Sequence, residues 1–500
     1  MAMTPSVNST TVAGVVGIVS VIALLKYIMT SRRGIHVPTL PKINPPPKFS
    51  DSDADIIVIG GGFTGATFAA RCGMDGRKVV MIEKNLGIDD TFRGEGLLPA
   101  GVNTLETLGM KDILDDVDGN FIKEYAFYDM RLGGKPAVVT LPEPGMLVMR
   151  HSSLVGALRK KALSQQSVTV IEGVGKELLK ENGRVVGVKY RRKGQDNMEE
   201  MRAPLVVVSD GHYPHLSSEF QTTYKPTSKS CCLALMLKDH EFGEGFGKHS
   251  LEFVVGTLHA QWNVFYINKR EIRSMIYVNG PTPSDLNNFV EEKVAPFAPD
   301  HMKESYLRSA KSVSRVQSVR TKSMAANVDS TPGVLVLGDA FNNRHPINAC
   351  GMTVALKDVC YWWNALSNVK DLTDDKAIYE QKLRFHKERL DWAYALNVMA
   401  ELSTRLFSLN DESIIKMQQF MIKSLRSVPE EERSKPNDVS GLFGGTITDP
   451  KAVNNMLDGT LQGTIQEIYD TQPYLYAVWE AMKVRRKWNA MMKEIMEPYA

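Results

Sequence analysis

The chain has 500 residues, enough for two or three domains with sizeable cores, and its 43% hydrophobic and 23% charged residues are typical of a globular protein. Its formal net charge of +3 is too small to indicate a nucleic-acid partner. The five cysteines are odd in number and contain no C-x-x-C pair, which argues against a disulfide framework and a zinc site. We therefore expect a protein of a reducing compartment with no metal centre.

The N-terminal segment, residues 1–33, is a candidate membrane anchor. Val12 to Leu25 is apolar except for one serine, and the nearby basic residues, Lys26 among them, all follow it. The positive-inside tendency then places the body of the protein in the cytoplasm. A secretory signal peptide and a peripheral hydrophobic tail are the alternatives, although no basic residue precedes the apolar run. Residues 34–53 are rich in proline and predict a stiff linker.

A glycine-rich turn follows the first predicted strand of the globular body. Ile56 to Ile59 is an apolar strand, and Gly60 to Gly65 matches G-x-G-x-x-G ahead of an Ala-rich helix. A second apolar strand, Val79 to Ile82, ends at Glu83. In this setting the glycines let the backbone approach a pyrophosphate, the helix N-terminus faces the phosphates, and the carboxylate can hold a ribose hydroxyl. The segment therefore predicts dinucleotide binding.

The middle of the chain predicts one helix and then a long series of strands. Residues 152–163 have helical spacing, and Leu205 to Val208 is a buried strand that ends at Asp210-Gly211. Alternation of apolar residues beyond that point predicts a mainly antiparallel sheet, the floor of a substrate domain. Tyr125 lies on an earlier alternating segment, where its hydroxyl either points into a pocket or is simply half-buried. The later strands are expected at Cys231 to Leu237, Leu251 to Val255, Val264 to Ile267 and Met275 to Val278.

Another strand that ends in a turn lies toward the C-terminus. Val334 to Leu337 is a short buried strand followed by Gly338-Asp339, and Gly351-Met352 open an apolar helix. The glycine permits close approach, the carboxylate accepts hydrogen bonds from sugar hydroxyls, and the helix start offers free N–H groups. Two dinucleotide-binding elements so far apart favour FAD over NAD. His345, which lies between the turn and the helix, either donates to the flavin or has a structural role, and we favour the structural role.

Beyond about Asp371 the sequence is predicted to be helical, and Tyr474 to Met496 alternates bulky apolar residues with basic ones. That helix is expected to lie on the protein surface or on a membrane. The chain as a whole predicts an α/β fold with a discontinuous Rossmann-like FAD-binding domain at 54–220 and 310–370. A mainly antiparallel β substrate domain is inserted at 221–309, with part of 120–150, and a C-terminal helical, membrane-associated region covers 371–500.

The order of the motifs resembles that of flavin-dependent aromatic hydroxylases and epoxidases, in which G-x-G-x-x-G is followed by D-G and then by G-D. The longer string G-D-A-F-N-N-R-H-P at Gly338 to Pro346, followed by G-M-T-V-A-L, is similar to that of squalene monooxygenases (squalene epoxidases). The resemblance covers about residues 54–409. Further matches are Gly94-Glu95 with Pro99 and Gly101, Tyr125, and Ile171-Glu172-Gly173.

This resemblance implies FAD-dependent epoxidation of squalene to 2,3-oxidosqualene in sterol biosynthesis, with dioxygen and with electrons from an NADPH-dependent flavoprotein reductase. It also implies contact with membrane lipid and a location on the endoplasmic reticulum or microsomal membrane. The residues then expected to bind FAD are Gly60, Gly62, Phe63, Thr64, Gly65, Glu83, Lys84, Arg93, Val168, Asp210, Gly338, Asp339, Gly351 and Met352. Those expected at the substrate or the reacting centre are Leu98, Tyr125 and His345.

The chain lacks two arginines that the family usually has. Thr91 and Ser153 stand at those positions. Arg93, Arg150 and Arg159 are nearby in sequence but are not equivalent to them. Either the phosphates are held by backbone and displaced arginines, or the affinity for flavin is weakened.

Further departures fall on the expected pocket. Leu98 stands where the family usually has glutamine, and Ala349 and Cys350 stand where it is richer in glycine. Two alternatives therefore remain open. One is a related flavin monooxygenase or oxidoreductase that acts on another isoprenoid lipid, and the other is a catalytically silent, membrane-bound paralogue.

Overall fold

The computed structural model describes residues 38–41, 47–50, 53–87, 92–133, 135–213, 215–220, 227–228, 230–238, 250–255, 261–268, 271–312, 316–408, 411–433 and 438–496. The expected N-terminal anchor, most of the linker and Thr91 lie outside these residues. Within the described part of the chain, no helix has both the length and the apolar character needed to cross a bilayer.

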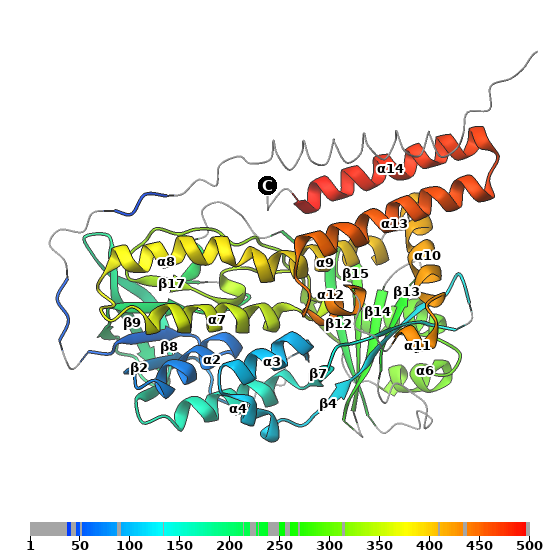
Figure 1. Ribbon diagram of the computed structural model, residues 1–500. Coiled ribbons are helices and arrows are strands. Elements are labelled where there is room, and N and C mark those ends of the chain that lie inside the picture. The colour runs from blue at the N-terminus through cyan, green and yellow to red at the C-terminus, as the bar shows by residue number, and fades with distance from the viewer. Residues whose placement is uncertain are drawn as a thin grey trace, which may run out of the picture.

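The first of two large sheets carries the predicted dinucleotide-binding motifs (Figure 1). Its strand order is β10-β9-β8-β2-β1-β11-β17, and the five strands from β8 to β17 run parallel to one another. Apolar side chains alternate between the two faces of the central strands, as a sheet buried on both sides requires. The strands are β1 (Ile56–Ile59), β2 (Val79–Glu83), β8 (Val168–Glu181), β9 (Arg184–Arg192), β10 (Glu199–Arg202), β11 (Leu205–Val208) and β17 (Val334–Val336).

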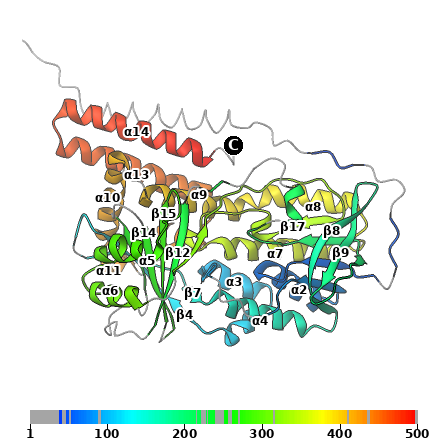
Figure 2. The ribbon, with the colours of Figure 1, turned by 180° about the vertical axis from the view of Figure 1, so that it is seen from behind.

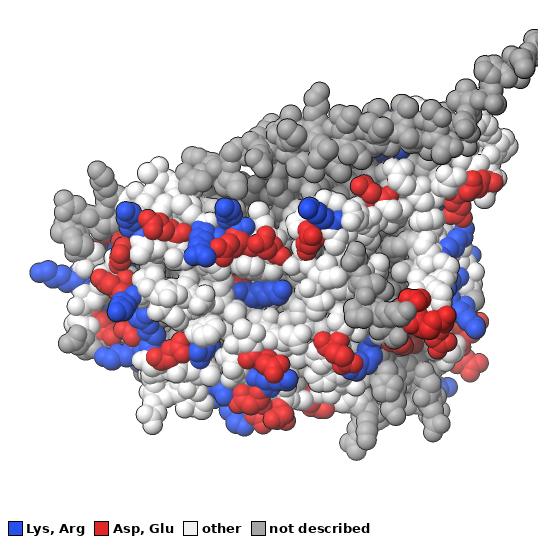
Figure 3. All heavy atoms as spheres, in the orientation of Figure 1, with Lys and Arg blue, Asp and Glu red and all other residues white. Residues whose placement is uncertain are grey.

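Helices cover one face of this sheet and share a single hydrophobic core with it. The long β8–β9 hairpin folds over the opposite face, where Tyr190 packs with strand residues such as Ile57 and Val206. Helix α8 lies outermost, and its exposed surface carries interspersed acidic and basic side chains (Figure 3). Pairs such as Lys376–Glu380 and Arg384–Glu388 contribute to this pattern. The helices are α2 (Phe63–Met74), α3 (Pro99–Thr107), α4 (His151–Leu163), α7 (Gly351–Ser367) and α8 (Asp375–Glu388).

The second large sheet has the order β16-β12-β15-β14-β13-β5-β6 and is antiparallel except where β13 pairs with β5. This confirms the predicted antiparallel sheet and the contribution of residues 120–150 to it. The FAD-domain boundary at residue 310 was wrong, because β16 hydrogen-bonds to β12. The strands are β5 (Glu124–Asp129), β6 (Ala137–Thr140), β12 (Ser230–Lys238), β13 (Ser250–Val255), β14 (Gln261–Asn268), β15 (Glu271–Asn279) and β16 (Gln317–Arg320).

Two sets of shorter elements complete the body. A three-stranded sheet, in the order β3-β7-β4, hydrogen-bonds β3 (Gly96–Leu97) and β4 (Gly119–Ile122) to β7 (Met146–Met149). Helices α5 (Leu286–Phe289) and α6 (Lys303–Ser312) pack on one face of the second large sheet.

The C-terminal helices cover the other face of the second large sheet, and α13 and α14 lie side by side at its upper edge (Figures 1 and 2). The prediction of a helical C-terminal region is thus confirmed for the described residues. The helices are α9 (Leu390–Ser408), α10 (Glu412–Arg426), α11 (Glu430–Arg433), α12 (Asp438–Gly444), α13 (Pro450–Thr471) and α14 (Tyr474–Met496).

Candidate active site

The carboxyl ends of the central parallel strands bring the three sequence motifs to one edge of the first sheet. Gly60 has φ +96, and a Cβ built on it would lie 2.4 Å from the carbonyl oxygen of Ser209. Gly338 has φ +70, and its Cβ would lie 2.6 Å from Thr64 Oγ1. The turn after β11 therefore packs on the glycine loop, and the Gly338-Asp339 turn packs on the start of α2. Neither position leaves room for a side chain.

The start of α2 forms a cradle for an anion. Gly62 is the N-cap, no side chain caps this end, and the first helical hydrogen bond runs from Ala66 N–H to Gly62 O at 2.9 Å. The N–H groups from Phe63 to Gly65 consequently have no helical partner. A Cβ on Gly62 would meet nothing within 4 Å, so the surface beside these groups is open. Free N–H groups at an open helix start fit a phosphate or pyrophosphate group.

Glu83 and Arg159 fix the shape of the glycine loop. The Glu83 side chain is nearly buried, and its Oε2 accepts a hydrogen bond from the Gly61 N–H at 2.7 Å. Arg159 Nε donates to Gly61 O at 2.7 Å, and its Nη1 donates to Asn85 O at 3.0 Å. Arg159 thus supplies a cation at this loop from α4, the same helix that carries Ser153. Its only sequence signal was its place on that helix.

The other basic residues near the motifs do not bind the glycine loop as Arg159 does. Arg150 forms an ion pair with Glu271 of β15 and is engaged at the second sheet. Lys84 is exposed just beyond β2. Burial is the largest cause of the lowered pKa of His212, and Asp339 opposes it. Arg93 lies close enough for its positive charge to lower this pKa further. Lys84 and Arg93 thus lie at the expected edge.

The two aspartates of the D-G and G-D motifs have different environments. Asp339 is exposed, and within the described residues its carboxylate has no hydrogen-bond partner, so it is available to a sugar hydroxyl. The Asp210 carboxylate instead accepts hydrogen bonds from the N–H groups of His215, Leu216 and Ser217, and from the Ser217 hydroxyl. The structure therefore corrects the assignment of Asp210 as a direct flavin ligand, because its own loop already occupies the carboxylate.

His212 joins the D-G turn to the G-D loop, a role that the sequence did not reveal. Its Nδ1 accepts from Asn343 Nδ2 at 3.0 Å, its Nε2 donates to Arg320 O at 3.2 Å, and Lys322 Nζ donates to its carbonyl oxygen at 2.8 Å. Burial lowers the pKa of the imidazole, whereas the nearby Asp339 raises it. A neutral ring that donates at one nitrogen and accepts at the other holds the two turns together.

Two of the expected site residues have structural roles instead. His345 is buried, with Nδ1 accepting from Ile347 N–H at 3.3 Å and Nε2 donating to Ser230 Oγ at 3.0 Å. Burial lowers its pKa to about 3, so the ring is neutral and we assign it a structural role. The assignment of Val168 as a flavin ligand was wrong. Val168 pairs with Val79 at the start of β2, roughly 13 Å along β8 from Glu172, which pairs with the last residue of β2.

A buried polar network holds the Gly338–Met352 segment in place. Asn342 Oδ1 accepts hydrogen bonds from Arg344 Nη2 at 2.6 Å and from Arg389 Nη2 at 2.9 Å. Arg389 also forms a buried ion pair with Asp358 of α7, with its Nε 2.9 Å from Oδ1. Burial raises the pKa of the Asp358 carboxyl, and Arg389 opposes that shift. Through Arg389, the C-cap residue of α8, the loop that carries Asp339 is therefore tied to helices α7 and α8.

Leu98 and Tyr125 lie in an apolar interior between the second sheet and the C-terminal helices. The Tyr125 hydroxyl donates to Met146 Sδ at 3.2 Å, and its ring meets Phe253 and Phe443 edge-on at centroid distances of 5.3 and 5.7 Å. Leu98 is fully buried. Burial raises the pKa of the Tyr125 phenol, which therefore stays protonated. This region suits an apolar ligand rather than proton transfer.

The start of α7 connects the motif edge to this interior. A Cβ on Gly94 would lie 3.7 Å from Met352 Cε, so the loop before β3 faces the Gly351-Met352 helix start. Ala349 has φ +50, in the left-handed region that favours glycine, which costs about 1–2 kcal/mol for an L-residue. Cys350 is buried and donates from Sγ to Leu396 O at 3.6 Å. The chain thus accommodates both departures from the family pattern.

Comparison with known proteins places these features in a family. Residues 202–445 match the family model for squalene epoxidase. The chain is 31% identical to mouse squalene monooxygenase over 378 residues, which cover 74% of this chain and 64% of the mouse protein. It is also 31% identical to squalene epoxidase 4 of Arabidopsis thaliana over 385 residues, which cover 74% of this chain and 73% of the plant protein.

Solved structures support the fold. The flavin-dependent brominase Bmp2 superposes with a TM-score of 0.61 at 16% identity, over 81% of this chain and 98% of the brominase. PqsL of P. aeruginosa, in complex with 2-aminobenzoylacetate, superposes with a TM-score of 0.56 at 18% identity, over 78% of this chain and all of PqsL. The chain spans 64% and 65% of the mouse and rat squalene monooxygenases that it matches. With the extent of the Arabidopsis match, these similarities show that the chain belongs to the squalene epoxidase family.

Proposed function

We propose that this protein is an FAD-dependent monooxygenase that converts squalene to 2,3-oxidosqualene with dioxygen, as part of sterol biosynthesis. One observation carries the proposal. The glycine loop and the Gly338-Asp339 turn meet at one sheet edge, and the start of α7 links that edge to a buried apolar interior. A dinucleotide cradle beside an apolar interior suits a cofactor-driven reaction on a hydrocarbon.

Each part of the cradle has a proposed role. The first turn of α2, with Gly60, Gly62, Phe63, Thr64 and Gly65, would hold the pyrophosphate, and Arg159 would stabilise the loop beneath it. Each carboxylate oxygen of Glu83 accepts one backbone N–H, from Gly61 or Asn85, and its remaining lone pairs would hold the adenosine ribose. Asp339 would accept hydrogen bonds from the ribityl chain. Gly351 and Met352, at the start of α7, would lie against the ring system. The flavin, once bound and reduced, supplies the oxygen-activating chemistry.

The protein's own part in the reaction is to hold the alkene and keep water out. The aromatic rings around Tyr125 and the apolar side chain of Leu98 would line the substrate chamber. Neither Tyr125, whose pKa burial raises, nor the neutral, buried His345 is suited to act as a base. A dry and closely fitting chamber orients the double bond and prevents unproductive loss of the activated oxygen.

We further propose that the protein works at the membrane of the endoplasmic reticulum, faces the cytoplasm and receives electrons from an NADPH-dependent flavoprotein reductase. Helix α14 supports the membrane part of this proposal, because its N-terminal turns expose large apolar side chains. Such a face is suited to rest in the interfacial region of a bilayer. The exposed residues are Tyr474, Leu475, Tyr476, Trp479 and Met482, at 66%, 83%, 45%, 55% and 51%.

The test uses the full chain in detergent with FAD, a generic NADPH-dependent reductase and squalene. Oxidosqualene is measured by mass spectrometry, and bound flavin by its absorption spectrum. We expect epoxide from the wild-type protein and at least a tenfold loss of flavin affinity in Asp339→Ala. The matched control is Asp115→Ala, because Asp115 is also exposed but lies in the short helix Lys111–Asp116, away from the motif edge.

Two other outcomes would redirect the assignment. Bound flavin that oxidises NADPH without forming an epoxide would exclude squalene. It would favour another isoprenoid lipid, as expected if Leu98 and Ala349 mark a remodelled chamber. Protein that binds no flavin after reconstitution would favour a catalytically silent paralogue.

A further inference from the structure

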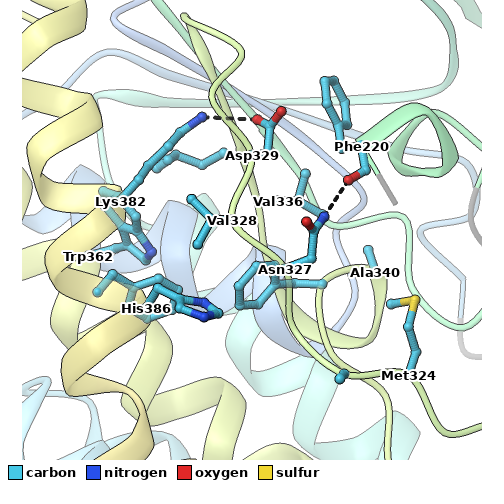
Figure 4. A pocket seen from close by; sticks show the side chains of 14 residues that line it. Phe220, Met324, Asn327, Val328, Asp329, Val336, Ala340, Trp362, Lys382 and His386 are labelled. Carbon is cyan, nitrogen blue, oxygen red and sulfur yellow. Dashed lines mark hydrogen bonds and ion pairs between the residues drawn. The ribbon is translucent and has the colours of Figure 1, made fainter. Parts of the chain in front are cut away.

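A small cavity lies behind the Gly338–Phe341 turn, between β17 and the helices α7 and α8 (Figure 4). Its volume is about 40 Å³, and the empty space including the open mouth is about 570 Å³. The closed part can hold roughly three water-sized groups. Its walls are mainly aromatic and aliphatic, with Phe220, Val328, Phe341 and Phe385 among them. A cavity with such walls favours an apolar occupant.

One hydrogen-bond donor in this cavity has no partner. Trp362 is 2% exposed, and within the described residues its indole Nε1–H makes no hydrogen bond. Figure 4 shows the indole nitrogen directed into the cavity, toward Val328 and His386. The adjacent Trp363 differs, because its Nε1 donates to Asp75 Oδ2 at 2.7 Å. A buried donor without a partner is rare, and it indicates that a ligand or water completes the site.

The charges around the cavity are balanced. Lys382 is 8% exposed, and its Nζ lies 3.1 Å from Asp329 Oδ2 and 2.8 Å from Thr331 O. Burial lowers the pKa of His386, and the nearby Arg389 lowers it further, so that imidazole is neutral. A charged ligand would leave an uncompensated charge beside the Lys382–Asp329 pair, whereas a neutral one would not.

We propose that this cavity binds a small, neutral, apolar molecule with a single hydrogen-bond acceptor, such as a carbonyl oxygen, which pairs with Trp362 Nε1–H. The site is separate from the cofactor cradle, and the proposal goes beyond the epoxidase function. Ala340 and Phe341, which line the cavity, directly follow Asp339. If Asp339 binds the flavin as proposed, this shared turn links the two sites, and we expect each ligand to change the affinity for the other by the same factor.

The binding test observes the tryptophan indole N–H signals of the full chain in detergent by ¹⁵N NMR. The chain has six tryptophans, and Trp362→Phe assigns the relevant signal. The probe is acetone, the smallest ketone, because the cavity holds only a few heavy atoms, and its control is 2-methylpropene, in which a methylene group replaces the oxygen. We expect the ketone to shift the Trp362 signal downfield in a saturable way in the millimolar range, with a much smaller shift from the alkene.

Two internal controls make the result decisive. The Trp363 signal should not move, because its donor is already paired with Asp75. Val328→Phe fills the cavity and should abolish the shift of the Trp362 signal. An unmoved Trp362 signal in the wild-type protein, or an equal shift in Val328→Phe, would overturn the proposal. Neither readout requires flavin or squalene, so its failure is distinguishable from failure of the epoxidase function.

The coupling has its own measurement. Saturating ketone should change the flavin dissociation constant at least twofold in the wild-type protein and leave it unchanged in Val328→Phe. A constant that stays the same in both proteins would refute the coupling.

Discussion

Gly338 packs so tightly against α2 that a single added methyl group should be costly. A Cβ there would lie 2.6 Å from Thr64 Oγ1 and 3.1 Å from Thr64 Cβ, on a backbone with φ +70. The left-handed conformation costs an L-residue about 1–2 kcal/mol, and the stiffer unfolded chain offsets about 0.4–1 kcal/mol of it. Overpacking adds about 1–3 kcal/mol. Gly338→Ala should therefore destabilise the protein by roughly 1–5 kcal/mol and weaken flavin binding.

Two further variants separate the backbone effect from the contact. Gly183 has φ +84, and a Cβ on it would meet nothing within 4 Å, so Gly183→Ala should cost only about 1 kcal/mol and leave flavin affinity unchanged. Thr64→Ala removes the nearest atom but keeps the Cβ at 3.1 Å, so the cost of Gly338→Ala should fall by about 1 kcal/mol in that background, which is part of the overpacking term.

The assay is denaturant unfolding followed by tryptophan fluorescence, together with flavin titration of each variant. Equal costs of Gly338→Ala with and without Thr64 would show that this contact is not what excludes a side chain. Equal losses of flavin affinity in Gly183→Ala and Gly338→Ala would refute the link between the turn and the cofactor.

Three further predictions concern charged or polar groups. Arg159→Lys keeps the charge but loses the paired contacts to the glycine loop, so the flavin dissociation constant should rise about tenfold, whereas Arg150→Lys should leave it nearly unchanged; equal effects would contradict the role of Arg159. Because burial lowers the pKa of His345 to about 3, the unfolded chain takes up a proton below its ordinary value of 6.5 while the folded protein does not. The free energy of unfolding should then fall by about 1.4 kcal/mol for each unit by which the pH is lowered from 6.5 toward 3. A slope that persists in His345→Gln would exclude this histidine as its source. Arg389→Met leaves the buried Asp358 carboxylate without its cation, although Trp392 Nε1–H still donates to it, and should cost about 3–5 kcal/mol in urea unfolding. Arg389→Met/Asp358→Leu should recover part of this cost, and no recovery would contradict this account.

Local sequence patterns predicted many of the elements well. The apolar run Ile56 to Ile59 forms β1 with the same bounds, and Tyr474 to Met496 forms α14 with the same bounds. Both follow from short-range periodicity and from turn or proline residues beside the element. The assignment of Val168 was wrong because local patterns do not show where along the sheet a residue lies. A strand can be recognised from its residues, but the edge at which each residue lies depends on its pairing register with β2.

The candidate site likewise contains residues that the sequence predicted and residues that it did not. The glycine motif and Asp339 were predicted, because a ligand-binding turn needs particular residue types at particular spacings. Arg159 and His212 were missed as site-shaping residues, because their partners come from distant segments of the chain. Asp210 could not be distinguished from Asp339 in sequence, because both follow a buried strand beside a glycine. Only the folded loop shows that the Asp210 carboxylate is already satisfied.

The sequence by itself determined the identity and order of the local elements: strand, glycine turn and helix near the N-terminus, the alternating strands in the middle, and the helical C-terminal region. These follow from side-chain periodicity and turn chemistry, which act over a few residues. Only the tertiary structure decided that Gly338 lies against Thr64, that Arg159 supports the glycine loop, and that Trp362 has an unpaired donor in a cavity. Such facts depend on how distant segments pack, because burial and the availability of partners are properties of the assembled core.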